Sequence, residues 1–113
     1  AHGTGTPAND ATESKALLAL CGEEAGSRIP VTSVKGTTGH TLGAAGAIEA
    51  IVTALSVMNN CVPPTAGFAE ADPECPVSVV AEAKTGYPQK VALSNSLGFG
   101  GHNASLALSP YRA

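Results

Sequence analysis

The sequence predicts an α/β fold in which helices pack against strands of a sheet. Three observations support this prediction: helical and strand-like segments alternate in the first half of the chain, three further strand-like segments follow, and the composition suits close layers. Hydrophobic residues make up 43% of the 113 residues, aromatic residues only 4%, and 13 residues are glycine. A core of alanine and aliphatic side chains with many glycines allows helices and strands to approach closely.

A first helix is expected over residues 10–21. Asn9 and Asp10 can each cap its N-terminus, and Gly22 is a plausible end. Glu13 follows Asp10 by three residues, which is the spacing of a capping box. Glu13 is therefore interpreted as part of the helix cap.

A strand over residues 29–34 and a second helix over residues 41–59 come next. Pro30 lies near the start of the strand, where proline is tolerated. The second helix is apolar nearly all round, with alanines between its larger side chains. Because this pattern is typical of a helix covered on most sides, we expect the helix to be buried.

The second half of the chain alternates loops and strands. Prolines mark a loop over residues 60–76. The remaining elements are strands over 77–80, 90–95 and 104–108, with a tight glycine loop over 98–101.

Charge and cysteine content argue against several classes of protein. The net charge of −3 argues against nucleic-acid binding. Cys21, Cys61 and Cys75 match no disulfide or zinc spacing, so we expect reduced thiols, a cytoplasmic location and no metal site. No signal-peptide pattern is visible. The apolar stretch 42–58 contains Glu49 and is shorter than the roughly 20 residues of a membrane span, so we expect no membrane insertion.

Two histidines lie in turns of small residues. His2 belongs to AHGTGTP at residues 1–7, and His40 belongs to KGTTGHTLG at residues 35–43. Small residues let a ligand approach the backbone, and an imidazole N–H beside them can polarise a carbonyl oxygen. One loop histidine is usually structural, and His102 is given no role, but two histidines in similar turns favour a functional site.

The charges around His40 suggest how its ring works. A helix N-terminus and Lys35 both disfavour positive charge there, so we expect a neutral ring that donates an N–H to an oxygen. Glu49 lies on the apolar second helix, and a buried carboxylate is costly unless it is paired. Lys35 can pair with it beside His40, or Glu49 can reach solvent between helices, and the sequence leaves both alternatives open.

Four segments together resemble the β-ketoacyl-acyl carrier protein synthases of fatty-acid and polyketide synthesis. They are AHGTGTP at 1–7, SVKGTTGHTLGAAGAIEA at 33–50, VPPT at 62–65 and SNSLGFGGHNASL at 94–106. The resemblance covers residues 1–113 and implies the C-terminal half of a thiolase-like layered α-β-α-β-α fold. It implies that the N-terminal half, with the nucleophilic cysteine, lies outside this chain, which alone is expected not to condense.

The resemblance implies an acyltransferase. Such enzymes catalyse the decarboxylative Claisen condensation of malonyl-acyl carrier protein with an enzyme-bound acyl chain. By motif, His2 and His40 look like the two catalytic histidines. Lys35 looks like the lysine beside them, and Glu49 like its partner.

The resemblance also implies how substrate is held. Thr4 and Thr6 are similar to the threonines that hydrogen-bond the phosphopantetheine arm. Phe99 looks like the gating phenylalanine, and its backbone N–H resembles part of an oxyanion hole. No cofactor is implied, since the substrates ride on the phosphopantetheine of acyl carrier protein. The implied partners are acyl carrier protein, the N-terminal half of the same enzyme and a second copy in a homodimer.

Two alternatives to a type II elongating enzyme remain. One is a non-catalytic partner similar to a chain-length factor, and the retained histidines and Lys35 argue against it. The other is a ketosynthase domain of a modular polyketide synthase, and Glu49 within GAAGAIEA argues against it. Leu97 and His102 stand where many relatives carry phenylalanine and threonine.

Overall fold

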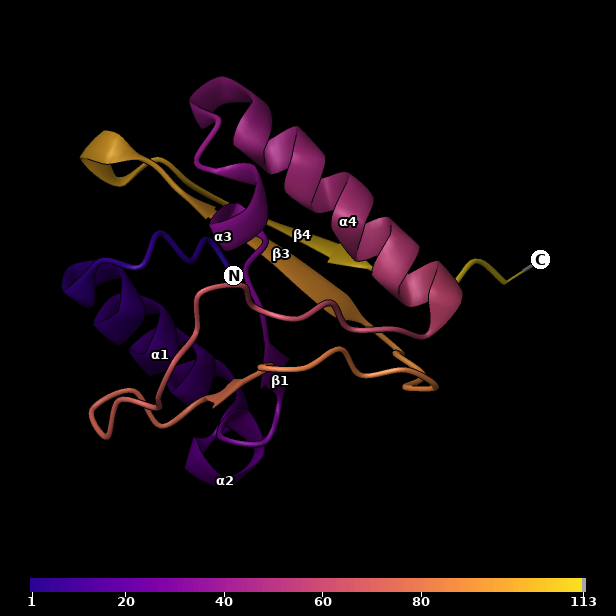
Figure 1. The fold of residues 1–113 in the computed structure, drawn as a ribbon, viewed down its shortest axis with the longest axis horizontal. Coiled ribbons are helices and arrows are strands. Elements are labelled where there is room, and N and C mark those ends of the chain that lie inside the picture. Colours follow the sequence, from indigo (N-terminus) through magenta and orange to yellow (C-terminus); the bar gives the residue numbers. More distant parts are fainter. Residues whose placement is uncertain (113) are drawn as a thin grey trace.

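Two pairs of strands and the helices around them make up the fold (Figure 1). The computed structural model describes residues 1–112 of the chain. β1 (Pro30–Val31) pairs in parallel with β2 (Ser78–Val79), and β3 (Ala92–Leu97) pairs antiparallel with β4 (Asn103–Leu108). The helical elements are α1 (Pro7–Cys21), α2 (Glu23–Gly26), α3 (Lys35–Thr38), the 3₁₀ turn η1 (Leu42–Ala44), α4 (Ala45–Asn59) and the 3₁₀ turn η2 (Phe99–Gly101).

All four predicted strands are present, but the first two are shorter than expected. Within 29–34 and 77–80, only Pro30–Val31 and Ser78–Val79 pair with each other. The β3–β4 ladder is longer, and η2 closes it where the tight glycine loop is predicted. The predicted helices and strands occur in the predicted order, but the structure adds two short helices that were not predicted, α2 after α1 and α3 within the expected turn around His40.

α1 begins at Pro7, three residues before the predicted start. Thr6 is the N-cap, and its hydroxyl oxygen accepts a hydrogen bond from the Asn9 N–H at 3.3 Å. Proline suits the first helical position because its φ is already helical and it has no N–H to satisfy. The predicted capping box with Glu13 is therefore wrong, and the Glu13 carboxylate bonds elsewhere.

α4 begins at Ala45, four residues later than predicted. Leu42 has a φ of 52°, in the left-handed region, and this breaks the helical path so that only the short η1 precedes α4. The predicted end at residue 59 is confirmed. Asn60, with a φ of 50°, supplies the left-handed cap that terminates the helix.

α4 is much less buried than its composition predicts. It packs on β3 and β4, and Figure 1 shows it lying along that pair of strands. Only Ala45, Glu49 and Val57 are buried, and the apolar side chains on its other side are exposed: Ile51, Leu55 and Met58. The prediction of a helix covered on most sides is wrong, because the described chain supplies a layer against one face only.

The segment Leu42–Asn59 also bears on the membrane question. Its 18 residues have a mean hydropathy of 1.5, which by length and composition alone would allow a membrane span, and 17% of them are buried. The expectation that this stretch is too short to span a membrane is therefore wrong. The contacts of α4 with β3 and β4, together with the buried Glu49, place the helix within a folded domain.

The loop over residues 60–76 crosses α3 at very short range. A Cβ atom added to Gly36 would lie 2.1 Å from the backbone oxygen of Ala66. No larger residue fits there without displacing backbone, so Gly36 fixes how the loop lies over the helix that begins at Lys35. Gly43 in η1 is different, since a Cβ there meets nothing within 4 Å.

We expect Gly36→Ala to destabilise the fold, whereas Gly43→Ala does not. Forcing an extra methyl group into a packed contact costs about 1–3 kcal/mol, because neighbouring backbone must shift. Thermal unfolding of the two variants measures the difference. Equal unfolding temperatures for Gly36→Ala and the unchanged protein would contradict this account of the loop.

Candidate active site

Side chains from other elements hold the turn that contains His2. The four backbone polar groups of His2 and Gly3 are all bonded. The two N–H groups donate to the carboxylate oxygens of Glu13, each at 2.8 Å. The Gly3 carbonyl accepts from Ser33 Oγ at 3.1 Å, and the His2 carbonyl accepts from the Lys35 ammonium. His2 itself is 9% exposed, so the ring is held in a largely buried position.

Lys35 and Glu49 form a buried ion pair. Lys35 opens α3 and is 8% exposed, while Glu49 lies on α4 and is 7% exposed. The Lys35 Nζ donates to Glu49 Oε1. The predicted pair is confirmed, and the alternative that Glu49 reaches solvent is wrong. The pair was expected to lie beside the His40 ring. In the structure the Lys35 ammonium instead donates to the backbone carbonyl of His2.

The two histidine rings meet edge to face. Their centroids lie 5.5 Å apart, with an angle of 85° between the ring planes. His40 is exposed, and its Nδ1 accepts a hydrogen bond from the Leu42 N–H at 3.2 Å. In a neutral ring this bond assigns the proton to Nε2, so His40 presents an N–H donor away from its own backbone. The two histidine turns that the sequence analysis singles out therefore lie together in the structure.

Burial, and next the Lys35 ammonium, hold the pKa of His2 below its usual value of 6.5. A buried imidazolium loses hydration, and a neighbouring positive charge opposes a second one. The Glu13 and Glu49 carboxylates act in the opposite sense but are smaller effects. His2 is thus a neutral ring at neutral pH, and its Nδ1 is buried without a partner within residues 1–112.

Thr4, Thr6 and Phe99, the other predicted site residues, make no side-chain hydrogen bond to either histidine among the described residues. The Thr4 and Thr6 hydroxyls lie 3.2 Å apart, and the Thr6 hydroxyl also caps α1. The Thr4 N–H donates to Asn9 Oδ1 at 3.1 Å, so Asn9 braces the turn. Phe99 lies in η2 between β3 and β4, and with 98% of it exposed, the structure brings it into contact with neither histidine.

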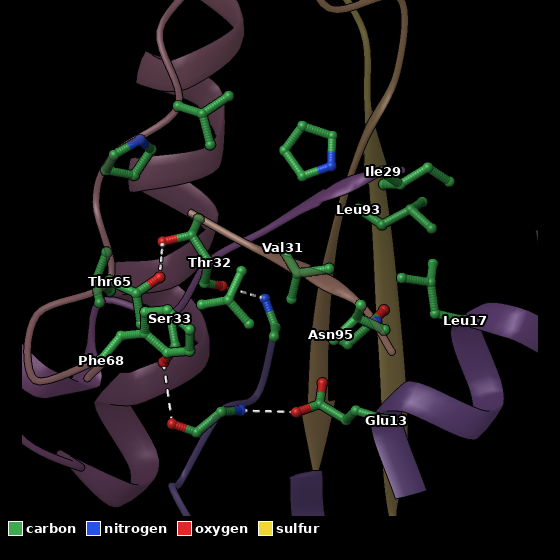
Figure 2. A pocket seen from close by; sticks show the side chains of 18 of the residues that line it. Glu13, Leu17, Ile29, Val31, Thr32, Ser33, Thr65, Phe68, Leu93 and Asn95 are labelled. Atoms are coloured by element: carbon green, nitrogen blue, oxygen red, sulfur yellow. Dashed lines mark hydrogen bonds between the residues drawn. The ribbon is translucent and has the colours of Figure 1, made fainter. Parts of the chain in front are cut away.

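A broad hollow of about 1270 Å³ adjoins the histidine pair. Figure 2 shows side chains from α1 (Leu17), β1 (Val31) and β3 (Leu93) around the same space. Its wall also includes Lys35, His40 and Glu49, but not His2. We therefore define the candidate site by the two rings and the ion pair, which the sequence analysis singles out, and not by the full extent of the hollow.

Metal-based chemistry has no obvious ligands here. Within residues 1–112 no three histidine, cysteine, aspartate or glutamate side chains come together as a possible metal site. The thiols of Cys21, Cys61 and Cys75 are free and half-buried. The site's described chemistry is that of two imidazoles and a charged pair.

Sequence reasoning missed two supports of the His2 turn, Glu13 and Ser33. Glu13 is interpreted there as a helix cap, because its spacing from Asp10 fits a local pattern. Its observed partners lie 10 and 11 residues away, and Ser33 donates to the Gly3 carbonyl, 30 residues away. No local pattern signals contacts of that kind, although the small residue at position 3 marks a backbone that something approaches closely.

The chain is similar to a known family and to named relatives. Residues 1–69, more than half of the chain, match the family described as the C-terminal domain of β-ketoacyl synthase. The chain is 46% identical over 112 residues to a 3-oxoacyl-[acyl-carrier-protein] synthase 2 from Synechocystis, covering 99% of this chain and 27% of that protein. It is also 46% identical over 113 residues to the synthase of the same name from Staphylococcus aureus, covering 100% of this chain and 27% of the relative.

Solved structures agree. A β-ketoacyl synthase from Burkholderia phymatum superposes with a TM-score of 0.87 at 38% identity, over 99% of this chain and 27% of that one. The ishigamide ketosynthase/chain length factor superposes with a TM-score of 0.90 at 39% identity, over 98% and 27%. The predicted fold class is confirmed. The chain spans about a quarter of the length of the relatives it matches.

We expect Lys35→Met to be strongly destabilising. Removing one partner leaves the Glu49 carboxylate buried and uncompensated, which costs about 3–5 kcal/mol in the free energy of unfolding. Arg28→Met is the matched control, since it breaks an ion pair with Glu24 whose side chains are 71% and 87% exposed. Such exposed pairs contribute at most about 1 kcal/mol. Chemical denaturation compares the two variants, and equal losses would contradict the role of burial.

Stability should fall with acidity through His2. Because the folded-state pKa lies below 6.5, the unfolded chain binds more protons between those two values. The contribution of His2 to stability is complete above about pH 6.5 and declines as the pH falls toward the folded pKa, where the decline ends. His2→Asn should remove this part of the slope, whereas replacing the exposed loop histidine in His102→Gln should not. Denaturation midpoints from pH 5 to 8 test this, and an unchanged slope in His2→Asn would refute it.

Proposed function

Because this chain belongs to the β-ketoacyl synthase family and has its thiolase-like fold, we propose that it supplies the malonyl-activating histidines of a condensing acyltransferase. The observation that carries the proposal is the pair of rings, 5.5 Å apart, with the His2 ring on a turn that other elements hold in place. One ring is neutral by burial and charge, and the other has its Nε2–H directed outward by a bond at Nδ1. Two imidazole N–H donors suit an oxygen that gains negative charge.

In the proposed reaction, malonyl-acyl carrier protein is decarboxylated at the histidine pair. The bond between C2 and the malonyl carboxylate breaks, carbon dioxide leaves, and the electron pair moves onto the thioester oxygen as an enolate. The N–H groups of His2 and His40 hold that oxygen. Since the donors are already in place before charge develops, they stabilise the transition state more than the ground state.

The enolate then forms the new carbon–carbon bond. Its C2 attacks the carbonyl carbon of an acyl group held as a thioester on a cysteine, and the carbon–sulfur bond breaks to release the thiolate. The product is a β-ketoacyl thioester on acyl carrier protein. We propose that the nucleophilic cysteine comes from the part of the synthase outside this chain, since none of its three cysteines lies in a matching motif.

Lys35 and Glu49 act on this site through the His2 turn. The ammonium bonds the His2 carbonyl and keeps positive charge next to the ring, which disfavours protonation of the imidazole. Glu49 balances the buried charge and ties it to α4. In the proposal, the pair therefore maintains a ring that donates a hydrogen bond and does not take up a proton from solvent.

The remaining predicted residues have supporting roles. We propose that the Thr4 and Thr6 hydroxyls bond the phosphopantetheine arm of acyl carrier protein, which enters beside the His2 turn. Phe99, exposed at the end of the β3–β4 hairpin, is proposed as the gate that closes over bound substrate. The names of the relatives, 3-oxoacyl-[acyl-carrier-protein] synthase 2, support acyl carrier protein as partner. We propose elongation as the role and a homodimer as the assembly.

A second candidate is a partner that controls chain length without catalysing condensation. The similarity to a structure titled ketosynthase/chain length factor favours it. The two histidines and the buried Lys35–Glu49 pair favour the enzyme, because a partner that performs no decarboxylation has no need of two neighbouring imidazole donors.

Malonyl decarboxylation and condensation should depend on both histidines. In a synthase that contains this chain and a cysteine-bearing part, His2→Ala and His40→Ala should each lower kcat by on the order of 10²–10³, the effect of losing one preorganised donor. His102→Gln is the matched control and should keep full activity. The measurement is release of carbon dioxide from malonyl-acyl carrier protein together with the yield of β-ketoacyl product.

The contrary results are distinct. Unchanged rates in both histidine variants would overturn the proposed role of the rings. A protein that is inactive alone but changes the product length of a second synthase would support the chain-length partner. The isolated 113-residue chain is expected to give no β-ketoacyl product, and product from it would show that the cysteine-bearing part is not needed.

A further inference from the structure

We propose that Gln89, with Ser56 and Cys61, forms a clasp between the C-terminal end of α4 and the segment that leads into β3, so that the helix and the strand move as one unit. Gln89 lies shortly before β3 and is the one residue of 81–90 that is not exposed. Its partners Ser56 and Cys61 lie 33 and 28 residues earlier in the sequence. None of the three belongs to a motif on which the proposed function rests.

The side-chain amide of Gln89 donates to three oxygens at the end of α4. They are the Ser56 carbonyl at 3.1 Å, the Ser56 hydroxyl at 2.9 Å and the Cys61 carbonyl at 3.2 Å. The Ser56 hydroxyl can accept from the amide because it donates its own proton to the Cys61 carbonyl. If the amide were turned over, its oxygen would face two carbonyl oxygens, so the hydrogen bonds hold it in one orientation.

The clasp lies where a helix needs donors from outside. The last carbonyls of an α-helix lack partners within the helix, and the aligned peptide dipoles place partial negative charge there. α4 ends at Asn59, and the left-handed Asn60 turns the chain away. The Asn60 carbonyl then accepts a hydrogen bond from the Tyr87 N–H at 2.7 Å. The segment before β3 is therefore bonded to the end of α4 by one side chain and by its backbone.

The other end of α4 also contacts β3. A Cβ atom added to Gly46, near the start of α4, would lie 3.5 Å from Ser96 Oγ, near the end of β3. The helix thus runs antiparallel to the strand and meets it at both ends. Glu49 lies on α4 between these two contacts. The clasp therefore opposes sliding of α4 along β3, a movement that would draw Glu49 away from the Lys35 ammonium.

The test is amide hydrogen exchange, followed by mass spectrometry, in the synthase that contains this chain. A peptide covering residues 55–63 reports on the end of α4, and a peptide covering residues 84–93 reports on the segment before β3. Gln89→Ala removes the three side-chain bonds together. We expect exchange in both peptides to quicken on the order of 10-fold, after correction for the changed residue, because local opening no longer breaks those bonds. Peptides from β4 should exchange as before.

A second variant separates hydrogen bonding from packing. Gln89→Glu keeps the size of the side chain, but at neutral pH its carboxylate has no proton to donate and would face the carbonyl oxygens of Ser56 and Cys61. Exchange in both peptides should therefore quicken at least as much as in Gln89→Ala. Full protection of both peptides in Gln89→Glu would show that packing alone holds the segment, and the clasp would be refuted.

Asn59→Ala is the matched control. The Asn59 side-chain amide donates to the Leu55 carbonyl at 2.8 Å, so it bonds the same end of α4 from within the helix. Removing it should leave exchange in the 84–93 peptide unchanged. The clasp is overturned if Gln89→Ala quickens only one of the two peptides or neither, or if Asn59→Ala quickens the 84–93 peptide equally. No substrate is needed, so the result stands whatever reaction the synthase catalyses.

Discussion

A single buried ammonium joins the three segments that carry the candidate chemistry. Lys35 lies at the start of α3, reaches Glu49 on α4 and bonds the backbone carbonyl of His2 near the N-terminus. Taking this charge out of water is expensive, and the cost is offset only when its bonds are well made. The positions of the turn, the short helix and the long helix are therefore coupled, because a shift in any one of them would leave a buried charge or carbonyl unsatisfied.

The same ammonium also sets the chemistry of the site. A histidine that faced only a carboxylate would hold its proton and act as a cation, whereas burial lowers the pKa of His2 and the nearby Lys35 ammonium lowers it further. The neutral His2 ring that results can donate to an oxygen without competing with it for a proton. Glu49 makes this arrangement possible, since it allows a positive charge to remain buried close to an imidazole. Structural support and electrostatic tuning thus come from one ion pair.

The ion pair of this site could be predicted from the sequence, because burying an unpaired carboxylate is costly. A lone carboxylate on an apolar helix requires a partner, and Lys35 was the candidate that the turn placed nearest. The exposure of α4 could not be predicted in this way, because apolar composition shows which surface a helix tends to bury and not whether the described chain supplies a layer to cover it. The late start of α4 depends on the left-handed Leu42, a conformation that leucine rarely adopts and no pattern signals. The contacts of Glu13 with the His2 turn could not be predicted, because the spacing of Glu13 from Asp10 fits a helix cap. The structure instead begins α1 at Pro7, with Thr6 as the N-cap.

The small residues around His2 follow from its two-sided support. Gly3 takes a left-handed conformation that points two N–H groups at Glu13, and it has no side chain to collide with Ser33. A larger residue there would have to leave the left-handed region, separating the N–H groups, and would also push the turn away from Ser33. Either movement would displace the ring, because His2 and Gly3 share the carboxylate that anchors them. The glycine after the histidine is therefore required for this arrangement, in which Glu13 accepts the two N–H groups while Ser33 and Lys35 donate to the two carbonyls.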